Sequence, residues 1–297
     1  MSGVSRRGRR PLYLGVVLSM LACGSADTLT VVSKNFTESV LLGEIVAQQL
    51  ERHGFSVDRR LNLGGTFICH EALRAGQADV YVEYTGTAYS AILALEVSRD
   101  RERVRQMVDS VYRARWDLVW MSPLGFDNTF AILVRGDDAR RLGLTTVSDA
   151  VSHAERWRPG FGYEFMERDD GFRGLVETYR LQFANSPVVM DLGLLYLALA
   201  EGEVDMVAGN STDGRIAALD LVHLRDDRGY FPPYEAAPVV RQDVLQRHPG
   251  VRAALAELGG TINVATMQRL NAQVDVERRS VRAVARDFLE GMNRATR

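Results

Sequence analysis

The chain has 297 residues, of which 46% are apolar, and its formal net charge is −2. This length and apolar content suffice for two domains with separate cores, and they exclude a disordered chain. The first 22 residues hold four arginines and no acid, so without them the net charge is −6 (−2 − 4), which argues against a nucleic acid partner.

Residues 1–26 have the composition of an export signal. Four arginines between positions 6 and 10 precede the short apolar run 12–22, which is far below the ~20 residues that span a bilayer. Cys23 directly after Ala22 resembles the lipidated cysteine of a bacterial lipoprotein, although Met20 and Leu21 fit the usual pattern poorly. Cleavage at the small residues 24–26 without lipidation is the alternative.

The next hundred residues alternate between strand and helix patterns, which predicts an α/β lobe. The expected strands are Thr28–Ser33, Val57–Leu63 and Ala78–Val82, and the expected helices are Thr37–His53, Thr66–Ala75 and Arg101–Trp116.

A turn-rich stretch, 123–128, then leads into a strand at Thr129–Arg135, where the chain is expected to cross to a second lobe. In that lobe we expect helices near Ser148–Trp157, Leu175–Tyr179 and Leu192–Glu201, and a strand near Tyr163. Phe231–Tyr234 reads as the return, and the helix-rich segments Val244–Leu258 and Thr261–Met292 are expected to pack on the first lobe. The predicted domains are therefore 27–126 (first lobe), 127–232 (second lobe) and 233–297 (return to the first lobe).

One segment of the chain is repeated without a gap. Residues 72–87 (ALRAGQADVYVEYTGT) are echoed 126 positions later by residues 198–213 (ALAEGEVDMVAGNSTD). Each copy contains a helix end, a glycine, a short apolar strand and a polar loop at the carboxyl end of that strand. Ligands of open α/β sheets bind at such ends, so two similar lobes with a ligand cleft between them are predicted.

Several motifs then match a known family in order from about residue 28 to the C-terminus. They are Ser33–Glu38 (SKNFTE), Asn62–Thr66 (NLGGT), Glu83–Thr87 (EYTGT), Ser211–Ile216 (STDGRI) and Pro233-Tyr234. They resemble the extracytoplasmic binding subunits of ABC importers for glycine betaine, choline and carnitine. The resemblance implies a two-lobed, periplasmic-binding-protein-like fold of type II, which captures a quaternary ammonium compound between its lobes.

In that family a cage of tyrosines holds the quaternary ammonium, while basic and hydroxyl groups hold the ligand's carboxylate. The resemblance places Tyr84 and Tyr234 in the cage, Thr87 as the hydroxyl donor, and Lys34 and Arg168 as the basic groups. The chemistry is consistent, because a trimethylammonium has no N–H to donate and is held by ring faces, each contributing ~0.5–2 kcal/mol. A carboxylate favours charge-assisted hydrogen bonds.

Two positions depart from the family pattern. Phe126 stands where a third cage aromatic is expected, with Phe130 as the alternative, and Asn210 stands in place of a fourth tyrosine. An asparagine has no ring face but offers donors and an acceptor. This change predicts either weaker betaine binding or a ligand that Asn210 can hydrogen-bond, such as carnitine, choline or a bulkier zwitterion like ergothioneine.

Simpler roles for these residues stay open. Tyr84 also suits an ordinary strand end, Phe126 and Tyr234 also suit packing at a hinge, and Arg168 also suits a solvated loop. Cys69-His70-Glu71 invites an enzyme interpretation, but adjacent helical residues point about 100° apart and cannot pair as nucleophile and base.

The sequence therefore predicts a monomeric, exported binding protein, periplasmic or lipid-anchored, that works with an ABC permease and its ATPase. No cofactor and no metal site are expected, because the five histidines are scattered and have no second cysteine nearby. A secreted enzyme remains the distant alternative, and a fused sensory receptor is disfavoured for lack of a signalling domain.

Overall fold

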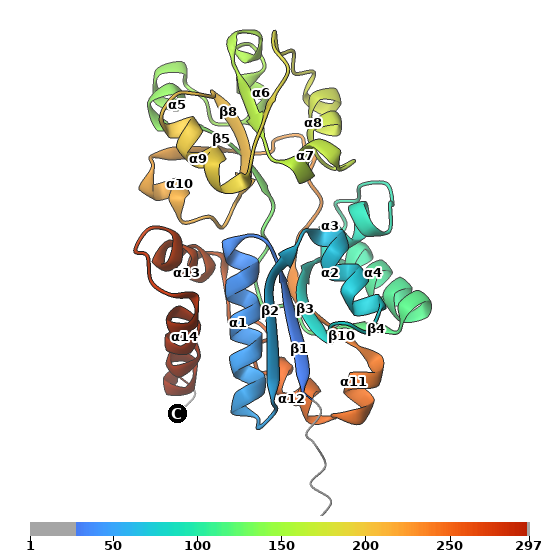
Figure 1. Cartoon of the computed structure of the whole chain (residues 1–297). Helices are drawn as coiled ribbons and strands as arrows, with labels where there is room; N and C mark the ends of the chain where they lie inside the picture. Colours follow the sequence, from blue (N-terminus) through green and yellow to red (C-terminus); the bar gives the residue numbers. More distant parts are fainter. Residues whose placement is uncertain (1–27, 296–297) are drawn as a thin grey trace, which may run out of the picture.

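The computed structural model describes residues 28–295, which form two α/β lobes, one above the other in Figure 1. The predicted export signal, 1–26, and Cys23 lie outside the described residues. No helix of the described part is long and apolar enough to cross a membrane.

The first lobe contains a five-stranded sheet in the order β2-β1-β3-β10-β4. β1 pairs in parallel with β2 and β3, whereas β10 is antiparallel to both β3 and β4. Its elements are β1 (Leu29–Lys34), α1 (Thr37–Arg52), β2 (Val57–Gly64), α2 (Thr66–Arg74), β3 (Val80–Tyr84), α3 (Thr85–Thr87), the π-helical turn η1 (Ala88–Ile92), α4 (Arg101–Trp116), β4 (Leu118–Trp120), β10 (Ala236–Arg241), α11 (Gln242–Arg247), α12 (Gly250–Ala256), α13 (Val264–Asp275) and α14 (Val281–Ala295).

The second lobe contains a sheet in the order β7-β6-β8-β5-β9. Here β6 is parallel to β7 and β8, and β5 is antiparallel to β8 and β9. Its elements are β5 (Phe130–Arg135), α5 (Gly136–Leu142), α6 (Val147–Ala150), the 3₁₀ turn η2 (Ala154–Arg156), β6 (Pro159–Phe161), α7 (Tyr163–Glu167), α8 (Phe172–Tyr179), β7 (Val188–Val189), α9 (Leu192–Ala200), β8 (Met206–Asn210), α10 (Arg215–Ala218) and β9 (Leu221–Leu224).

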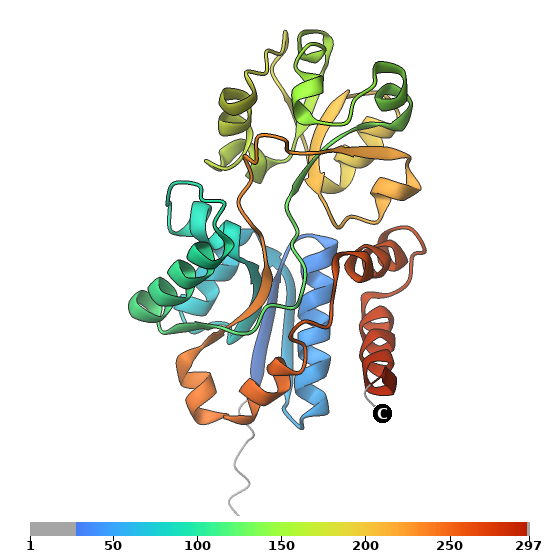
Figure 2. The same cartoon turned by 180° about the vertical axis from the view of Figure 1, so that it is seen from behind.

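Helices cover both faces of each sheet, because alternate strand residues enter different cores. Val31 and Val80 pack with α1 and the C-terminal helices, while Val32 and Tyr81 pack with α2 and α4. Figure 2 shows α14 alongside α1, and residues of α13 and α14 pack in the same core as those of α1.

The α/β class and the two lobes are confirmed, but one predicted helix is wrong. The strand expected near Tyr163 is present at Pro159–Phe161, and Tyr163 itself begins α7. The helix expected over Ser148–Trp157 is broken into α6 and η2, with Trp157 already extended.

The two lobes are joined by two chain segments that run side by side (Figures 1 and 2). Asp127, before β5, forms a β-bridge with Glu235, before β10. The backbone N–H of Asn128 donates to the carbonyl of Tyr234 at 3.1 Å, and that of Ala236 donates to the carbonyl of Phe126 at 3.2 Å. The crossing is therefore a short ribbon of two paired strands.

Candidate functional site

A cavity of about 150 Å³ lies between the lobes, next to the crossing segments. An engineered protein cavity of about 150 Å³ binds benzene, so this one suits a small ligand. Its lining combines aromatic rings with a few charged and amide side chains, which is typical of small-molecule sites. The lining residues are Lys34, Asn35, Phe36, Tyr84, Thr87, Asn128, Phe130, Gly162, Tyr163, Glu164, Phe165, Arg168, Asp191, Leu192, Ala208, Asn210 and Tyr234.

Lys34 and Tyr84 come from the adjacent ends of β1 and β3 in the first lobe. The Lys34 ammonium lies 2.6 Å from a carboxylate oxygen of Glu83 and 4.7 Å from the ring centroid of Tyr84. The Tyr84 hydroxyl donates to Oε1 of Glu38 at 2.7 Å. Both side chains are thus fixed from behind, and the buried Tyr84 ring keeps its place in the wall of the cavity.

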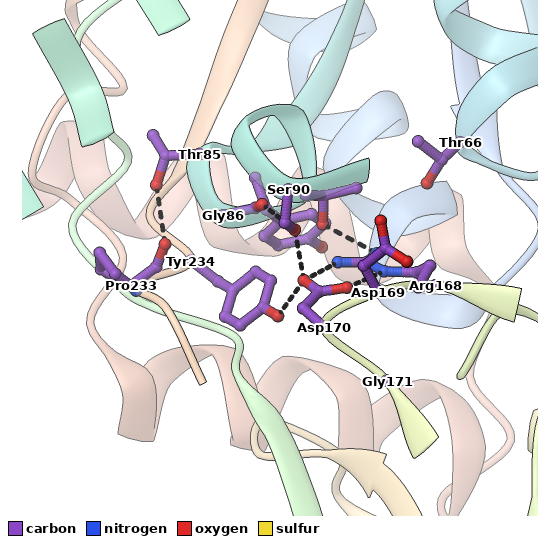
Figure 3. Close-up of polar contacts among 12 residues, drawn as sticks. Thr66, Thr85, Gly86, Ser90, Arg168, Asp169, Asp170, Gly171, Pro233 and Tyr234 are labelled. Carbon is purple, nitrogen blue, oxygen red and sulfur yellow. Dashed lines mark hydrogen bonds and ion pairs between the residues drawn. The ribbon is translucent and has the colours of Figure 1, made fainter. Parts of the chain in front are cut away.

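Arg168 reaches the cavity from the loop after α7 in the second lobe. Figure 3 shows its guanidinium bound to Asp170, with Nε 2.7 Å from Oδ1 and Nη2 2.5 Å from Oδ2. Its Nη1 donates to the Thr87 hydroxyl at 3.2 Å, which joins the two lobes. Burial disfavours the charge of Arg168, but the hydrogen bonds and the charge of Asp170 raise its pKa overall.

Asp170 also accepts hydrogen bonds from two other parts of the chain. The hydroxyl of Tyr234 lies 2.6 Å from Oδ2, and the hydroxyl of Ser90, in the first lobe, donates to the same oxygen (Figure 3). Burial raises the pKa of Asp170, but Arg168 and the hydrogen bonds of Ser90 and Tyr234 together outweigh burial, and the net shift is downward. The carboxylate therefore stays ionised. This network places the Tyr234 ring beside Arg168, 5.9 Å from centroid to guanidinium carbon.

The structure corrects the placement of Phe126. Its side chain is buried in the core of the first lobe and is not among the residues that line the cavity. Phe130, at the start of β5, lines the cavity instead, 5.9 Å from Tyr234 between ring centroids and 5.0 Å from the Arg168 guanidinium carbon. Phe126 lies before the crossing ribbon turns toward the second lobe, whereas Phe130 lies beyond it.

Asn210, at the end of β8, lines the cavity and also a second one of about 300 Å³. Asn35, Phe36, Asp191 and Leu192 line both cavities as well. The second cavity is more polar, with Asp213, Arg215, Asn271 and Asp275 in its walls. The two cavities therefore adjoin each other along the wall that contains Asn210.

Six of the seven residues singled out in the sequence thus meet around one cavity, and Phe126 does not. Sequence reasoning missed other lining residues, chiefly Phe36, Asn128 and Phe165. Phe36 and Asn128 lie within stretches that the motifs and the crossover had already marked, so position along the chain was a usable signal. Phe165 carried no such signal.

The family model for the substrate-binding domain of ABC-type glycine betaine transport systems matches residues 27–291. The chain belongs to this family. Its members are extracytoplasmic binding components that work with ABC permeases, so the predicted class of protein is confirmed. They are transport proteins rather than enzymes.

Curated relatives differ in the ligand that their names record. The glycine-betaine-binding protein of Pseudomonas aeruginosa is 36% identical, over 89% of this chain and 88% of its own length. The carnitine transport binding protein of Listeria monocytogenes is 33% identical, over 92% and 89%. An ergothioneine transport permease and binding protein of Helicobacter pylori is 36% identical over 88% of this chain, which spans only 47% of that longer protein.

A crystal structure of a glycine betaine/carnitine/choline ABC transporter protein has the same architecture. Its TM-score is 0.76 at 31% identity, and the match covers 89% of this chain and 98% of the other. The expected fold, two lobes with a ligand cleft between them, is therefore confirmed.

The Cys69-His70 pair of this family member has the wrong electrostatics for a nucleophile and its base. Burial raises the pKa of the Cys69 thiol to about 12 and lowers the pKa of His70 to about 4. The His70 ring packs instead at 4.5 Å from Trp116 and 5.3 Å from Tyr112, between ring centroids. Both residues are part of the core behind α2.

Proposed function

We propose that this chain captures glycine betaine or a related quaternary ammonium compound, such as choline or carnitine, in the cavity between its lobes and delivers it to an ABC permease. The observation that carries this proposal is the pairing of ring faces with Arg168 around one small cavity. This cavity is lined by Tyr84, Phe130 and Tyr234 together with the buried Arg168.

The rings suit the ammonium end of such a ligand. A quaternary ammonium cannot donate a hydrogen bond, so its contacts are dispersion and the attraction of a cation to ring faces, worth about 2 kcal/mol or more once water is excluded. Tyr84 and Tyr234 each donate their hydroxyl to a buried carboxylate, Glu38 and Asp170. These bonds fix both rings and leave the hydroxyls without a free proton to offer the ligand.

Arg168 suits the carboxylate end. Contacts with described residues engage three of the five N–H groups of its guanidinium, which leaves two for a ligand. The Thr87 hydroxyl lies beside it, and Lys34 adds a second positive charge to the same cavity. Charge-assisted bonds of this kind are the strong ones in proteins, so a betaine is favoured over choline, which has no carboxylate.

Delivery follows from the two-lobed arrangement. A ligand that contacts both lobes stabilises the state in which the lobes are together. We propose that the monomer, in this state, docks on a permease driven by a separate ATPase. The protein is proposed to be exported, and either free in the periplasm or held at the membrane through Cys23.

The test is isothermal titration of residues 27–297 with glycine betaine, carnitine, choline, ergothioneine and, as a control, proline. The Arg168→Lys variant keeps the charge but loses the two-pronged contact with Asp170. We expect it to weaken betaine and carnitine about tenfold and choline much less. Arg113→Lys, on the outer surface of α4, is the matched control. Failure of every quaternary amine to bind the native chain would contradict the proposal.

A second candidate ligand is a longer zwitterion, such as ergothioneine or an amino-acid-like compound. Asn210 favours it, because this amide sits where the two cavities adjoin and can hydrogen-bond a polar arm that extends from one into the other. In the same titrations, ergothioneine binding tenfold or more tighter than glycine betaine would support this candidate. The reverse order would support the smaller betaines.

A further inference from the structure

Glu38 is a buried carboxyl group that the ligand proposal does not use. It lies in the first turn of α1, and its exposed fraction is 3%. It is not among the residues that line the cavity of about 150 Å³, but it does line the adjoining cavity of about 300 Å³. An ionised carboxylate in such a place is costly unless hydrogen bonds satisfy it. Four donors do so here.

Each oxygen of Glu38 accepts two of these hydrogen bonds. Oε1 accepts from the Tyr84 hydroxyl at 2.7 Å and from Nδ2 of Asn128 at 2.8 Å. Oε2 accepts from Nδ2 of Asn271 at 2.9 Å and from the Thr212 hydroxyl. Since all four partners donate, the ionised form matches them best, although burial outweighs the four hydrogen bonds and raises the pKa of Glu38.

The four donors come from four separate parts of the fold. Tyr84 ends β3, Asn128 lies in the crossing ribbon, Asn271 lies in α13, and Thr212 belongs to the second lobe. Thr212 follows Asn210 by two residues in the loop after β8 and is fully buried. Asn271 strengthens the same contact by donating to the Thr212 carbonyl at 2.9 Å.

Only the Thr212 contact requires the two lobes to be together. Tyr84 and Asn271 belong to the same lobe as Glu38, and Asn128 lies in the ribbon that joins the lobes. When the lobes separate, Glu38 keeps its partners in the first lobe and loses the hydroxyl of Thr212. The same carboxylate thus touches a ring of the ligand cavity and the opposite lobe.

We propose that Glu38 is a positioning residue that couples the cage to closure: it orients the Tyr84 ring and holds the second lobe through Thr212. The use of glycine betaine as the probe in the test below rests on the function proposed above. Closing the lobes on a ligand then completes the hydrogen bonds of Glu38, so the contact stabilises the closed state and slows ligand release.

The test compares Thr212→Val and Thr212→Ser by stopped flow and isothermal titration, with glycine betaine as the probe. Valine keeps the shape and removes the hydroxyl, while serine keeps the hydroxyl. We expect Thr212→Val to raise the dissociation rate and the Kd about 10- to 100-fold with little change in association rate, because a bond formed on closure affects release. Thr212→Ser should stay within about threefold of the native values.

Thr261→Val is the matched control, because its hydroxyl binds the Leu258 carbonyl within the first lobe. Equal release rates for the native chain and Thr212→Val would overturn the proposal while leaving the ligand assignment intact. Glu38→Gln adds an independent check. The substitution replaces one acceptor oxygen by an NH₂ group, which would face partners that themselves donate hydrogen bonds. It should therefore weaken the binding of glycine betaine at least as much as Thr212→Val does.

Failure of the ligand proposal is distinguishable from failure of this one. If the native chain binds none of the compounds in the titration, small-angle X-ray scattering tests the contact between Glu38 and Thr212 without any ligand. Loss of the Thr212 hydroxyl must then increase the radius of gyration of the ligand-free chain. An unchanged radius would overturn the role of Glu38.

Discussion

The two copies of the internal repeat, 72–87 and 198–213, have the same secondary structure up to the ends of their strands and then differ in both backbone and chemistry. Residues 85–87 form α3, whereas residues 211–213 form a turn. In each, a helix (α2 or α9) ends near a glycine with positive φ, 68° at Gly76 and 77° at Gly202. In each, a five-residue central strand follows, β3 or β8, parallel to one neighbour and antiparallel to the other. The repeat therefore builds equivalent places in the two sheets.

The equivalence extends to single hydrogen bonds. Asp79 and Asp205, 126 positions apart, each accept a backbone N–H from the neighbouring parallel strand or its start, at 2.8 and 2.9 Å. Each also pairs with the arginine that ends the antiparallel neighbour, Arg241 of β10 or Arg135 of β5. The features that the two copies share are therefore the ones that build the sheets.

The differences lie at the carboxyl ends of the two strands and on the helices before them. Tyr84 corresponds to Asn210, and Gly86 corresponds to Thr212, so the first copy supplies a ring and the second supplies an amide and a hydroxyl. Within the repeat, the same scaffold therefore ends in a ring in the first lobe and in hydrogen-bonding groups in the second. Outside the repeat both lobes mix the two kinds of group, because Lys34 of the first lobe and Phe130 of the second also line the cavity.

The largest expected effect is a difference in affinity for glycine betaine between substitutions of Tyr84 and of Asn210. Tyr84→Ala should weaken glycine betaine roughly 30- to 100-fold, because a desolvated cation–π contact contributes about 2 kcal/mol or more. Asn210→Ala should change it less than about threefold. Isothermal titration measures both, with circular dichroism to verify folding, and Tyr84→Phe is the control that keeps the ring. Equal losses at the two positions would contradict the division of roles.

Gly86 offers a second way to test the comparison. A Cβ at Gly86 would lie 2.6 Å from a ring carbon of Tyr234 and 2.7 Å from the carbonyl of Pro233, whereas the second copy carries the full side chain of Thr212. Gly86→Ala should therefore destabilise the protein by about 2 kcal/mol through overpacking, measured by urea unfolding. Gly291→Ala, which meets nothing within 4 Å, is the control.

His70 and its counterpart Tyr196 differ in how their polar atoms are satisfied. The Tyr196 oxygen accepts the N–H of Asn210 at 2.8 Å, whereas neither ring nitrogen of His70 has a hydrogen-bond partner among residues 28–295. Burial lowers the pKa of His70 from 6.5 to about 4 in the folded state. The unfolded state then binds more protons between these pH values, so stability falls as pH decreases through this window.

We expect protonation of His70 to lower the free energy of unfolding by about 1–2 kcal/mol between pH 7 and pH 5. The effect is about 1.4 kcal/mol per pH unit, and it applies only to the part of this interval below pH 6.5. His70→Phe keeps the aromatic contacts and should flatten that part of the pH dependence in urea unfolding. Replacing the half-buried His153 in the same way is the control, and it should leave this part of the pH dependence of stability unchanged. A slope that persists in His70→Phe would place the titrating group elsewhere.

The smallest expected effect comes from a substitution that gives the second copy the ring found in the first. Asn210→Tyr restores a ring opposite Tyr84 and should strengthen glycine betaine roughly fivefold, within the range of one exposed to partly buried cation–π contact. It should also weaken any ligand that extends toward Asp213. Unchanged affinity for both kinds of ligand in titration would show that residue 210 does not face the bound molecule.

Much of this arrangement was predictable from local patterns. The strand and helix of each repeat, and the residues at the strand ends, follow from apolar spacing and glycine stops. Asp127 and Glu235 show why other parts were not: the ribbon they form joins positions 108 residues apart, so sequence alone could not decide between Phe126 and Phe130. The strand predicted near Tyr163 exists, but its bounds were out of reach, because a segment as short as Pro159–Phe161 has too few residues to show a period.

The role proposed for Glu38 could not be predicted from the sequence, because it also depends on contacts between residues far apart in the chain. Its donors lie 46, 90, 174 and 233 positions away, and none has a local pattern that points to a shared acceptor. An acid in the first turn of a helix is common because the helix dipole favours it. Only the three-dimensional arrangement distinguishes this acid from an ordinary one.

Asn210 ends β8 and Thr212 lies two residues further on, and this spacing matters for how the protein can diversify. Position 210 lines both cavities, whereas position 212 lines only the second one and binds Glu38 of the opposite lobe. If Asn210 contacts the solute and Thr212 holds the closed state as proposed, a substitution at 210 would exchange one class of solute for another while the motion of the lobes is preserved. A duplicated scaffold of this kind would let natural selection alter what is transported without rebuilding how transport is triggered.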